Sequence, residues 1–357
     1  MNVILGIIFH SIGGFASGSF YMPFNKVKGW AWESFWIIGG LFSWLIVPPI
    51  AAYLTIPGFW HIIAGASSSV LFYTYILGLL WGIGGLTYGL GVRYLGMSLG
   101  NSIVLGFCAA FGALVPSIYY AVFPQDGKTT IIDMMADPGG QLVLLGVLVC
   151  LIGIAIAGWA GMMKEKELTH EQRTASVAEF HLVKGVIIAI ISGILSAFFN
   201  YAIEAGKPMG EIANQLWKAA NPGQGEFLFQ NNVIFVVILW GGLTTNFIWT
   251  TILHFKNKTY GDFVNTKTPI AKNIIFSALA GTTWFLQFFF YGMGESKLGN
   301  GASSWILHMS TIILTANMWG IYRKEWKGVS AKTKWTIISG IATIILSVFL
   351  VGIGNSL

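Results

Sequence analysis

Long apolar runs follow one another along almost the whole chain, separated by short polar stretches. Each of ten runs is about 20 residues long or more, which is the length an α-helix needs to cross the hydrocarbon core of a bilayer. We expect these spans, numbered in chain order, at residues 3–23, 34–54, 67–91, 97–123, 140–160, 184–204, 231–254, 272–294, 299–321 and 334–354. The pattern therefore predicts an all-α polytopic membrane protein with ten transmembrane helices.

The composition supports this class. Of the 357 residues, 55% are apolar and only 10% are charged, whereas a soluble domain carries about 25% charged residues. Cys108 and Cys150 both lie in apolar runs, so no disulfide framework is expected. The net charge of +6 is not gathered into a basic face, so no nucleic-acid partner is indicated. The expected surroundings are a lipid bilayer.

The basic residues are unevenly distributed among the connecting loops. Sixteen of the 20 lysines and arginines fall in or beside the loops after the odd-numbered spans, and the other four are Lys128, Lys207, Lys218 and Lys297. Because cytoplasmic loops are enriched in Lys and Arg, the odd loops should be cytoplasmic and both termini outside. The first run lacks a basic start, so we expect a retained helix and not a cleaved signal peptide.

The sequence also suggests an internal repeat. A charged loop at 161–183 separates residues 1–160 from 184–357, with five spans on each side. Gly6–Tyr21 aligns with Gly185–Asn200 at six identities in sixteen, and Leu-Gly-Asn recurs at 99–101 and 298–300. An odd number of spans per half gives an inverted repeat, an architecture of secondary transporters with the binding site near the midplane. We therefore expect a 5+5 inverted repeat.

Two histidines within spans are candidates for proton coupling. His10, Gly14, Ser17 and Tyr21 are spaced 4, 3 and 4 apart, so they share one helical face. His308 in span nine lies at a similar predicted depth, about 12 Å from the outer end. A titratable group within a span is costly and usually faces an interior cavity, and histidine titrates near 6.5. The alternative is that each is a neutral histidine bonded within the helix packing.

Span eight carries residues suited to a neutral polyol. Trp284, Gln287 and Tyr291 share one helical face, where a ring could stack on a sugar and an amide could bond its hydroxyls. We include as further substrate-binding candidates Tyr21, Trp81, Tyr88, Asn200 and Trp305. The alternative is a belt of aromatic residues at the membrane interface, which we expect for Trp30, Trp32, Trp36, Trp60 and Trp326.

Charged residues at the ends of spans are candidates for a gate. Glu33 and Arg93 both lie at predicted cytoplasmic ends and could pair, although topology alone would also explain them. No carboxylate is predicted at the middle of a span, which argues against a cation exporter of the small multidrug type. No catalytic, nucleotide-binding or metal-binding motif is visible, so we expect no enzyme, cofactor or metal site.

The predicted outer loop after span six is unusually built. Met209, Ile212, Ala213, Leu216 and Trp217 share a helical face, and the helix should end at Asn221-Pro222-Gly223. We expect a short helix lying on the membrane interface, with a lid over an outward-facing cavity as the alternative.

Longer strings identify a family. The chain resembles the bacterial L-rhamnose–proton symporters of the drug/metabolite transporter superfamily in HSIGGFASGSFYMPFNKVKGWAWESFW, WGIGGLTYGLGVRYLGMSLG, WFLQFFFYGMGESKLG, SSWILHMS and VGIGN. The resemblance runs from end to end and implies ten helices, an inverted repeat and uptake of L-rhamnose, or a related 6-deoxy sugar, with a proton at the bacterial inner membrane. It brings no residue roles with it, so the candidate sites rest on the helical faces. A drug/metabolite-type exporter, a sodium-coupled carrier of another neutral solute, and a membrane component of a larger assembly are the alternatives.

Overall fold

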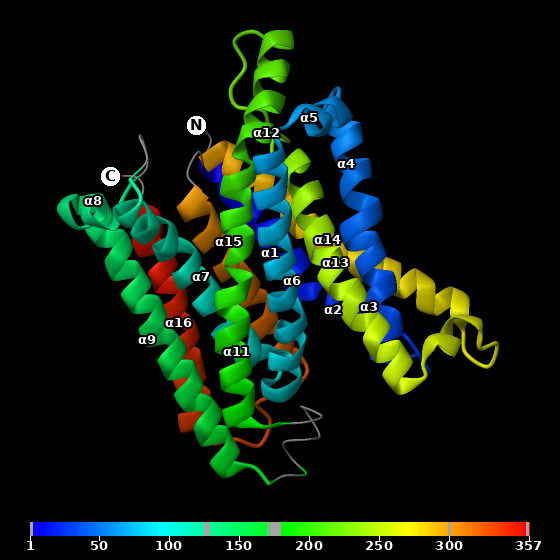
Figure 1. Ribbon diagram of the computed structural model, residues 1–357. Coiled ribbons are helices and arrows are strands. Elements are labelled where there is room, and N and C mark those ends of the chain that lie inside the picture. Colours follow the sequence, from blue (N-terminus) through cyan, green and yellow to red (C-terminus); the bar gives the residue numbers. More distant parts are fainter. Residues whose placement is uncertain (1–2, 125–128, 170, 172–179, 299–300, 355–356) are drawn as a thin grey trace. The chain divides into compact units, whose positions relative to one another are not determined.

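The structure is a computed structural model that describes residues 3–124, 129–169, 171, 180–298, 301–354 and 357 (Figure 1). Within these ranges the chain forms helices joined by turns and loops, and none of the described residues is in a strand. This confirms the all-α class.

Nine described helical segments have the length and apolar composition to cross a membrane. They are Ile4–Phe24, Trp32–Thr55, Ser68–Leu95, Leu99–Val122, Pro138–Glu167, Leu182–Ala220, Asn232–Asn257, Ile270–Leu298 and Ala331–Gly354. Each overlaps one of the predicted runs, which confirms a polytopic membrane protein. The remaining predicted run, 299–321, overlaps the helix α15 (Gly301–Tyr322) of 22 residues, which is about 33 Å long. The ten-span count therefore stays a prediction.

The chain divides into two compact units, and each unit combines segments from both sequence halves. The first unit contains Met1–Ile83 and Phe198–Gly299, and the second contains Gly84–Ala197 and Asn300–Leu357. The three boundaries fall within three of the predicted spans, 67–91, 184–204 and 299–321. These two compact units do not coincide with the two predicted halves, residues 1–160 and 184–357. The relation between those halves stays a prediction.

The first unit begins with α1 and α2 and is completed by the helices around residues 198–298. Its elements are α1 (Val3–Ser19), α2 (Tyr21–Phe24), α3 (Trp32–Gly40), a π-helix η1 (Leu41–Ile46), α4 (Val47–Thr55), α5 (Phe59–Gly65), the start of α6 (Ser68–Leu95), α12 (Phe198–Ala220), α13 (Asn232–Asn257), a 3-10 turn η2 (Tyr260–Val264) and α14 (Ile270–Leu298). Helix α14 is central to this unit because α1, α2, α3 and η1 all pack against it.

The second unit holds the rest of α6 and the helices on either side of the predicted linker at 161–183. Its other elements are α7 (Met97–Val122), α8 (Ile131–Ala136), α9 (Pro138–Glu167), α11 (Leu182–Ser196), α15 and α16 (Ala331–Gly354). Helices α9 and α16 form the most extensive helix pair, and α7 packs against both α11 and α15. Figure 1 shows α9 and α16 running side by side over most of their length.

Small residues at intervals of seven explain the α9–α16 pair. A Cβ added at Gly153 would lie 3.0 Å from the Gly340 carbonyl oxygen, and one added at Gly146 would lie equally close to the Ser347 carbonyl oxygen. Gly139 meets Gly354 in the same way. The two backbones thus approach at positions 139, 146 and 153 of one helix and 354, 347 and 340 of the other. Small residues that let backbones approach closely are a main source of helix association in lipid.

The first unit contains a similar close crossing between α3 and α14. A Cβ added at Gly281 would overlap the backbone of Gly39, so the two helices touch through their main chains. Nearby, the Trp36 indole donates a hydrogen bond to Asn246 Oδ1 at 2.9 Å, which ties α3 to α13. At the predicted cytoplasmic end, the Asp262 carboxylate accepts from the Ala31 amide and the Ser34 hydroxyl. Polar contacts therefore join α3 to α13 and to η2, while α3 and α14 meet through their packed backbones.

Helix α12 extends well beyond the apolar run that predicts it. It continues without interruption to Ala220, so the residues from Met209 to Trp217 belong to it (Figure 1). The prediction of a separate short helix on the interface is therefore wrong. Pro208 is the one strong helix breaker within α12, and the helix continues through it. The next breaking residues are Asn221-Pro222-Gly223, directly after the last helical residue.

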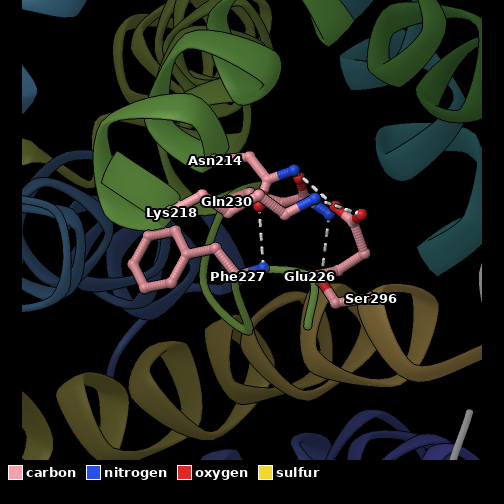
Figure 2. Close-up of polar contacts among 6 residues, drawn as sticks. All are labelled: Asn214, Lys218, Glu226, Phe227, Gln230 and Ser296. Atoms are coloured by element: carbon pink, nitrogen blue, oxygen red, sulfur yellow. Dashed lines mark hydrogen bonds and ion pairs between the residues drawn. The ribbon is translucent and has the colours of Figure 1, made fainter. Parts of the chain in front are cut away.

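The loop after α12 folds back along the helix. The Glu226 carboxylate accepts from Lys218 Nζ at 2.6 Å and from the Asn214 amide, while the Phe227 amide donates to Asn214 Oδ1 at 2.8 Å (Figure 2). The Phe227 ring stacks on Trp217 with centroids 5.2 Å apart. Gln230 then donates to the Ser296 hydroxyl of α14. This loop is fixed to both α12 and α14.

Candidate functional site

An aromatic cluster lies at the centre of the first unit. We call it the Trp284 cluster, and its members are Trp284, Phe20, Trp36, Trp44, Trp81 and Phe288. Phe20 stacks on Trp284 with centroids 5.1 Å apart, and Trp44 meets it edge-on at 5.4 Å. The six rings come from four separate stretches of sequence. Trp284 itself is only half-buried, so part of its ring stays accessible.

The π-helix η1 supplies Trp44. Pro48 and Pro49 follow directly, and proline has no backbone N–H to continue an α-helical hydrogen-bond ladder. The wider π-turn over Leu41–Ile46 occurs just before these prolines, as is common at functional sites. Trp44 is thereby buried, and its indole nitrogen has no hydrogen-bond partner among the described residues. The segment thus presents a ring and an N–H donor in the same place.

Gln287 lies on α14 one turn after Trp284. Its side chain is 5% exposed, and its Nε2 has no hydrogen-bond partner in the described part of the chain. Leaving a buried amide donor unsatisfied costs about 1–3 kcal/mol, so such a group calls for an explanation. A hydroxylated ligand against the Trp284 cluster would satisfy it. That Trp284 and Gln287 belong to one sugar site stays a prediction.

His10 packs against the C-terminal half of α14. Its ring meets the Tyr291 ring edge-on, with centroids 5.4 Å apart, and both side chains are buried. A Cβ added at Gly294 would lie 2.5 Å from His10 Nε2, so the imidazole occupies space that only a glycine leaves open. The sequence placed His10 and Tyr291 on inward faces of two different helices, and the structure brings them into contact.

The other candidates are divided between the two units. In the first unit, Trp81 contacts Trp284, Tyr21 meets Phe20 at 5.8 Å, and Asn200 is a largely buried residue of α12. The second unit holds Tyr88, Trp305 and His308.

Within the second unit these residues make contacts of their own. Tyr88 donates a hydrogen bond to Asn101, and the Trp305 indole donates to the Cys108 carbonyl at 3.2 Å. Trp305 also packs against Gly112, and His308 is buried one turn after Ser304. A joint role for His308 and His10 stays a prediction, as does a common cavity for the candidates of the two units.

The two gate candidates differ in their surroundings. Glu33 is buried, and its Oε1 accepts hydrogen bonds from Asn257 Nδ2 at 2.9 Å and from Thr259 Oγ1 at 2.6 Å. It therefore joins the start of α3 to the end of α13 within the first unit. Arg93 is an exposed residue near the end of α6, in the second unit. Their pairing stays a prediction.

The sequence reasoning missed Trp36, Trp44 and Phe20. Trp36 was assigned to the interface belt, and this is wrong, because it is 3% exposed and bonded to Asn246. Trp30 and Trp326 are buried as well, whereas a belt residue must face lipid headgroups. The signals were present in the polar Asn246 within an apolar run and in the Pro48-Pro49 pair.

Comparisons with known proteins cover the whole chain. Residues 1–356 match the family model of the L-rhamnose-proton symport protein, RhaT. Proteins named L-rhamnose-proton symporter from Yersinia pestis (strain Pestoides F) and Yersinia pseudotuberculosis serotype O:1b (strain IP 31758) are each 39% identical over 357 residues. The alignments cover 99% of this chain and 98% of each relative. A further protein of that name, from Yersinia pestis bv. Antiqua (strain Antiqua), is 38% identical over the same length.

Proposed function

Because the chain belongs to the L-rhamnose–proton symport protein family, we propose that it takes up L-rhamnose together with a proton across the bacterial cytoplasmic membrane. The observation that carries this function is the match of the family model over residues 1–356. The protein is a multi-pass membrane transporter and not an enzyme.

The sugar site is assigned to the Trp284 cluster and Gln287. A pyranose has one face of C–H groups and a rim of hydroxyls, and L-rhamnose adds a methyl group. The accessible part of the Trp284 ring suits the C–H face, and the unsatisfied Gln287 Nε2 and Trp44 Nε1 suit the hydroxyls. A site of this kind rejects analogues that lack a hydroxyl, because its buried donors would then stay unpaired. Tyr21, Asn200, Tyr88, Tyr291 and Trp305 are kept as proposed substrate contacts on the basis of the sequence.

The transport cycle rests on ten helices arranged as an inverted 5+5 repeat with both termini outside. The repeat is supported by a local irregularity at a similar place in the first span of each half. Helix α1 gives way to α2 at Phe20, and α11 gives way to α12 at Ala197. In the alignment of Gly6–Tyr21 with Gly185–Asn200, Ala197 corresponds to Gly18, two residues from Phe20. Phe20 and Ala197 both keep right-handed helical dihedrals, so each span continues through its irregularity.

Proton coupling is assigned to His10 and His308, with Glu33 and Arg93 at the predicted cytoplasmic gate. Protonation and sugar binding must favour the same conformational step, since a ligand shifts an equilibrium only by its differential affinity for the two states. One charge moved through about 150 mV supplies about 3.4 kcal/mol. At about 1.4 kcal/mol for each factor of ten, this energy supports an accumulation of roughly 300-fold. One proton per sugar is therefore sufficient.

The external pH of a lightly buffered, de-energised suspension of cells expressing the chain tests the function. Adding L-rhamnose should cause prompt alkalinisation, and a protonophore should abolish it. Entry of labelled L-rhamnose without a pH change would contradict proton coupling. Absence of both would contradict the sugar assignment, and acidification would indicate export by exchange.

A further inference from the structure

A short chain of hydrogen bonds at the predicted cytoplasmic end of the first unit reaches an imidazole that the proposed function does not use. It runs from the Glu33 carboxylate through the Thr259 hydroxyl to His254, and we call it the His254 relay. Thr259 Oγ1 donates to Glu33 Oε1 at 2.6 Å, and His254 Nδ1 lies 3.0 Å from the same hydroxyl oxygen. Glu33 is 3% exposed. All three residues belong to the first unit.

The end of α13 brings these groups together. His254 lies in the last turn of the helix, and Lys258 follows it with a φ of 57°, the left-handed conformation that commonly ends a helix. The chain turns back at this point, and the Thr259 amide donates to the His254 carbonyl at 3.2 Å. The turn places the Thr259 hydroxyl beside the imidazole and within reach of Glu33 in the first turn of α3.

The directions of the hydrogen bonds fix the tautomer of His254. An ionised carboxylate only accepts, and the Thr259 hydroxyl has a single hydrogen, which it gives to Glu33. The hydroxyl oxygen therefore accepts the hydrogen of His254 Nδ1. In a neutral imidazole one nitrogen is a donor and the other an acceptor. The hydrogen thus sits on Nδ1, and Nε2 presents a lone pair.

This lone pair is shielded from water. His254 Nε2 is buried and has no hydrogen-bond partner among the described residues. Phe263 packs against the imidazole with ring centroids 5.5 Å apart, and Trp30 meets Phe263 edge-on at 5.4 Å. The Trp30 side chain is 8% exposed, and its Nε1 also has no partner in the described part of the chain. Buried polar atoms left in this way call for a ligand.

The charges around His254 favour a proton as the ligand of Nε2. The other titratable side chains of the segments at this end are exposed, namely Lys26, Lys28, Lys256, Lys258, Tyr260, Lys267 and Lys272, except Asp262. Asp262 accepts from the Ala31 amide and the Ser34 hydroxyl, and η1 and α4 hold no charged side chain. Glu33 is therefore the buried counter-charge, and it interacts electrostatically with His254. A proton on Nε2 makes the two residues a neutral pair.

Protonation also strengthens the connection between two helices. With a proton on Nε2, the hydrogen bond from Nδ1 becomes charge-assisted, and such bonds are about twice as strong as neutral ones. The relay joins the start of α3 to the end of α13, so protonation favours the arrangement in which these ends stay together. By reciprocity, an arrangement that separates them binds the proton less tightly and releases it.

Resting on the proposed symport function, we propose that His254 is the group from which the transported proton leaves on the predicted cytoplasmic side, in addition to the roles assigned to His10 and His308. Nε2 holds the proton, while Thr259 and Glu33 compensate its charge. Separation of α3 from α13 breaks the relay, and the proton passes from Nε2 to water. His254 is then neutral again, with its remaining hydrogen on Nδ1.

His254→Asn tests the proposal, because the asparagine amide keeps a donor for Thr259 but offers no nitrogen that titrates. Purified full-length protein in proteoliposomes is compared in two assays, L-rhamnose counterflow at equal pH and accumulation driven by an imposed pH gradient. One pH unit corresponds to about 1.4 kcal/mol, so the unaltered protein should accumulate the sugar up to about tenfold. His254→Asn should keep counterflow, reach only equal concentrations on both sides and show no sugar-induced proton uptake.

Two further positions serve as controls. His61 is an exposed histidine on α5 outside the relay, so His61→Asn should retain the tenfold accumulation. Thr259→Val keeps the size of the side chain and removes the hydroxyl, so it should lose most of the accumulation. Thr259→Ser restores the hydroxyl and should restore the tenfold accumulation.

The tautomer is tested without any transport assay. Nitrogen-15 NMR of the solubilised protein, labelled at histidine, should show a neutral His254 at alkaline pH with its hydrogen on Nδ1. Nε2 should gain a proton as the pH falls. The His254 signal is assigned by its loss in His254→Asn. A hydrogen on Nε2 at alkaline pH would contradict the relay.

The transport assays can also overturn the proposal. Tenfold accumulation by His254→Asn would remove His254 from proton release. Loss of counterflow together with accumulation would instead assign His254 to folding or to the passage of the sugar. Full accumulation by Thr259→Val would remove the link to Glu33. Failure of the unaltered protein in both assays would overturn the symport function itself, which keeps the two failures distinguishable.

Discussion

Replacing Gln287 by leucine should weaken sugar transport and stabilise the protein at the same time. The side chain is 5% exposed, and its Nε2 has no hydrogen-bond partner among the described residues. An unsatisfied buried donor costs about 1–3 kcal/mol, and an apolar group of similar size removes that cost. We therefore expect Gln287→Leu to raise the free energy of unfolding of the sugar-free protein by about 1–2 kcal/mol.

The effect on the sugar has the opposite sign. Losing one or two hydrogen bonds to L-rhamnose should weaken binding by about 1–2 kcal/mol, which corresponds to a factor of about 5–30 in the half-saturating concentration. The two quantities are measured separately, by unfolding of the detergent-solubilised protein and by initial rates of counterflow over a range of L-rhamnose concentrations.

Gln230→Leu is the matched control. Gln230 donates to the Ser296 hydroxyl at 3.3 Å, so its replacement should lower stability and leave the half-saturating concentration unchanged. If Gln287→Leu lowers stability and leaves the half-saturating concentration unchanged, the unsatisfied amide is not a ligand donor. The sugar site would then have to lie away from this face of α14.

Three other perturbations follow from the packing and the charges. Trp284→Ala removes the ring shared by five aromatic neighbours and should lower the free energy of unfolding by about 3 kcal/mol or more. Trp284→Phe should keep the fold and weaken only uptake. Measuring both thermal unfolding and uptake distinguishes the two variants. Gly281→Leu forces apart two touching backbones and should lower the free energy of unfolding by at least about 1–3 kcal/mol. Gly158→Leu is the control, because a Cβ at Gly158 meets open space, and it should lower the free energy of unfolding little. Equal unfolding temperatures for the two variants would contradict the close crossing of α3 and α14. The hydrogen bond from Lys218 and the one from Asn214 lower the pKa of Glu226 below its ordinary value of 4.5, so these contacts stabilise the loop after α12 above that pH and are lost as the pH falls below it. Hydrogen exchange of the loop, corrected for intrinsic rates, should report the loss, and Glu226→Gln should abolish this pH dependence.

The positions of the helices could be predicted because lipid thickness imposes a length on every apolar run. The exception is α12, whose apolar run ends near residue 204 although the helix continues to Ala220. Beyond that point Met209 and Ala213 are buried against the first unit, while Leu216 is exposed. Hydropathy marks where a chain can cross a membrane, but helix ends follow capping and breaking residues, which here begin at Asn221.

The candidate site was predictable only as far as one helix extends. The spacing of Trp284, Gln287 and Tyr291 places them on one face whatever surrounds them. That Phe20 and Trp44 would complete the cluster depends on contacts between segments about 240 or more residues apart in sequence, which no local period encodes. Trp44 further requires the π-turn before Pro48, a local distortion that moves it away from its regular helical position.

The division of the chain into units has a consequence for its synthesis. The first unit needs Met1–Ile83 together with Phe198–Gly299, so its early helices must be inserted and then remain without their partners while the next 114 residues are made. Helix α1 cannot pack on α14 until the ribosome has passed residue 298. Contacts so distant in sequence slow folding and leave partly assembled states exposed. A gene cut in the linker at 161–183 would yield two polypeptides of which neither holds a complete unit, so each would depend on the other to fold.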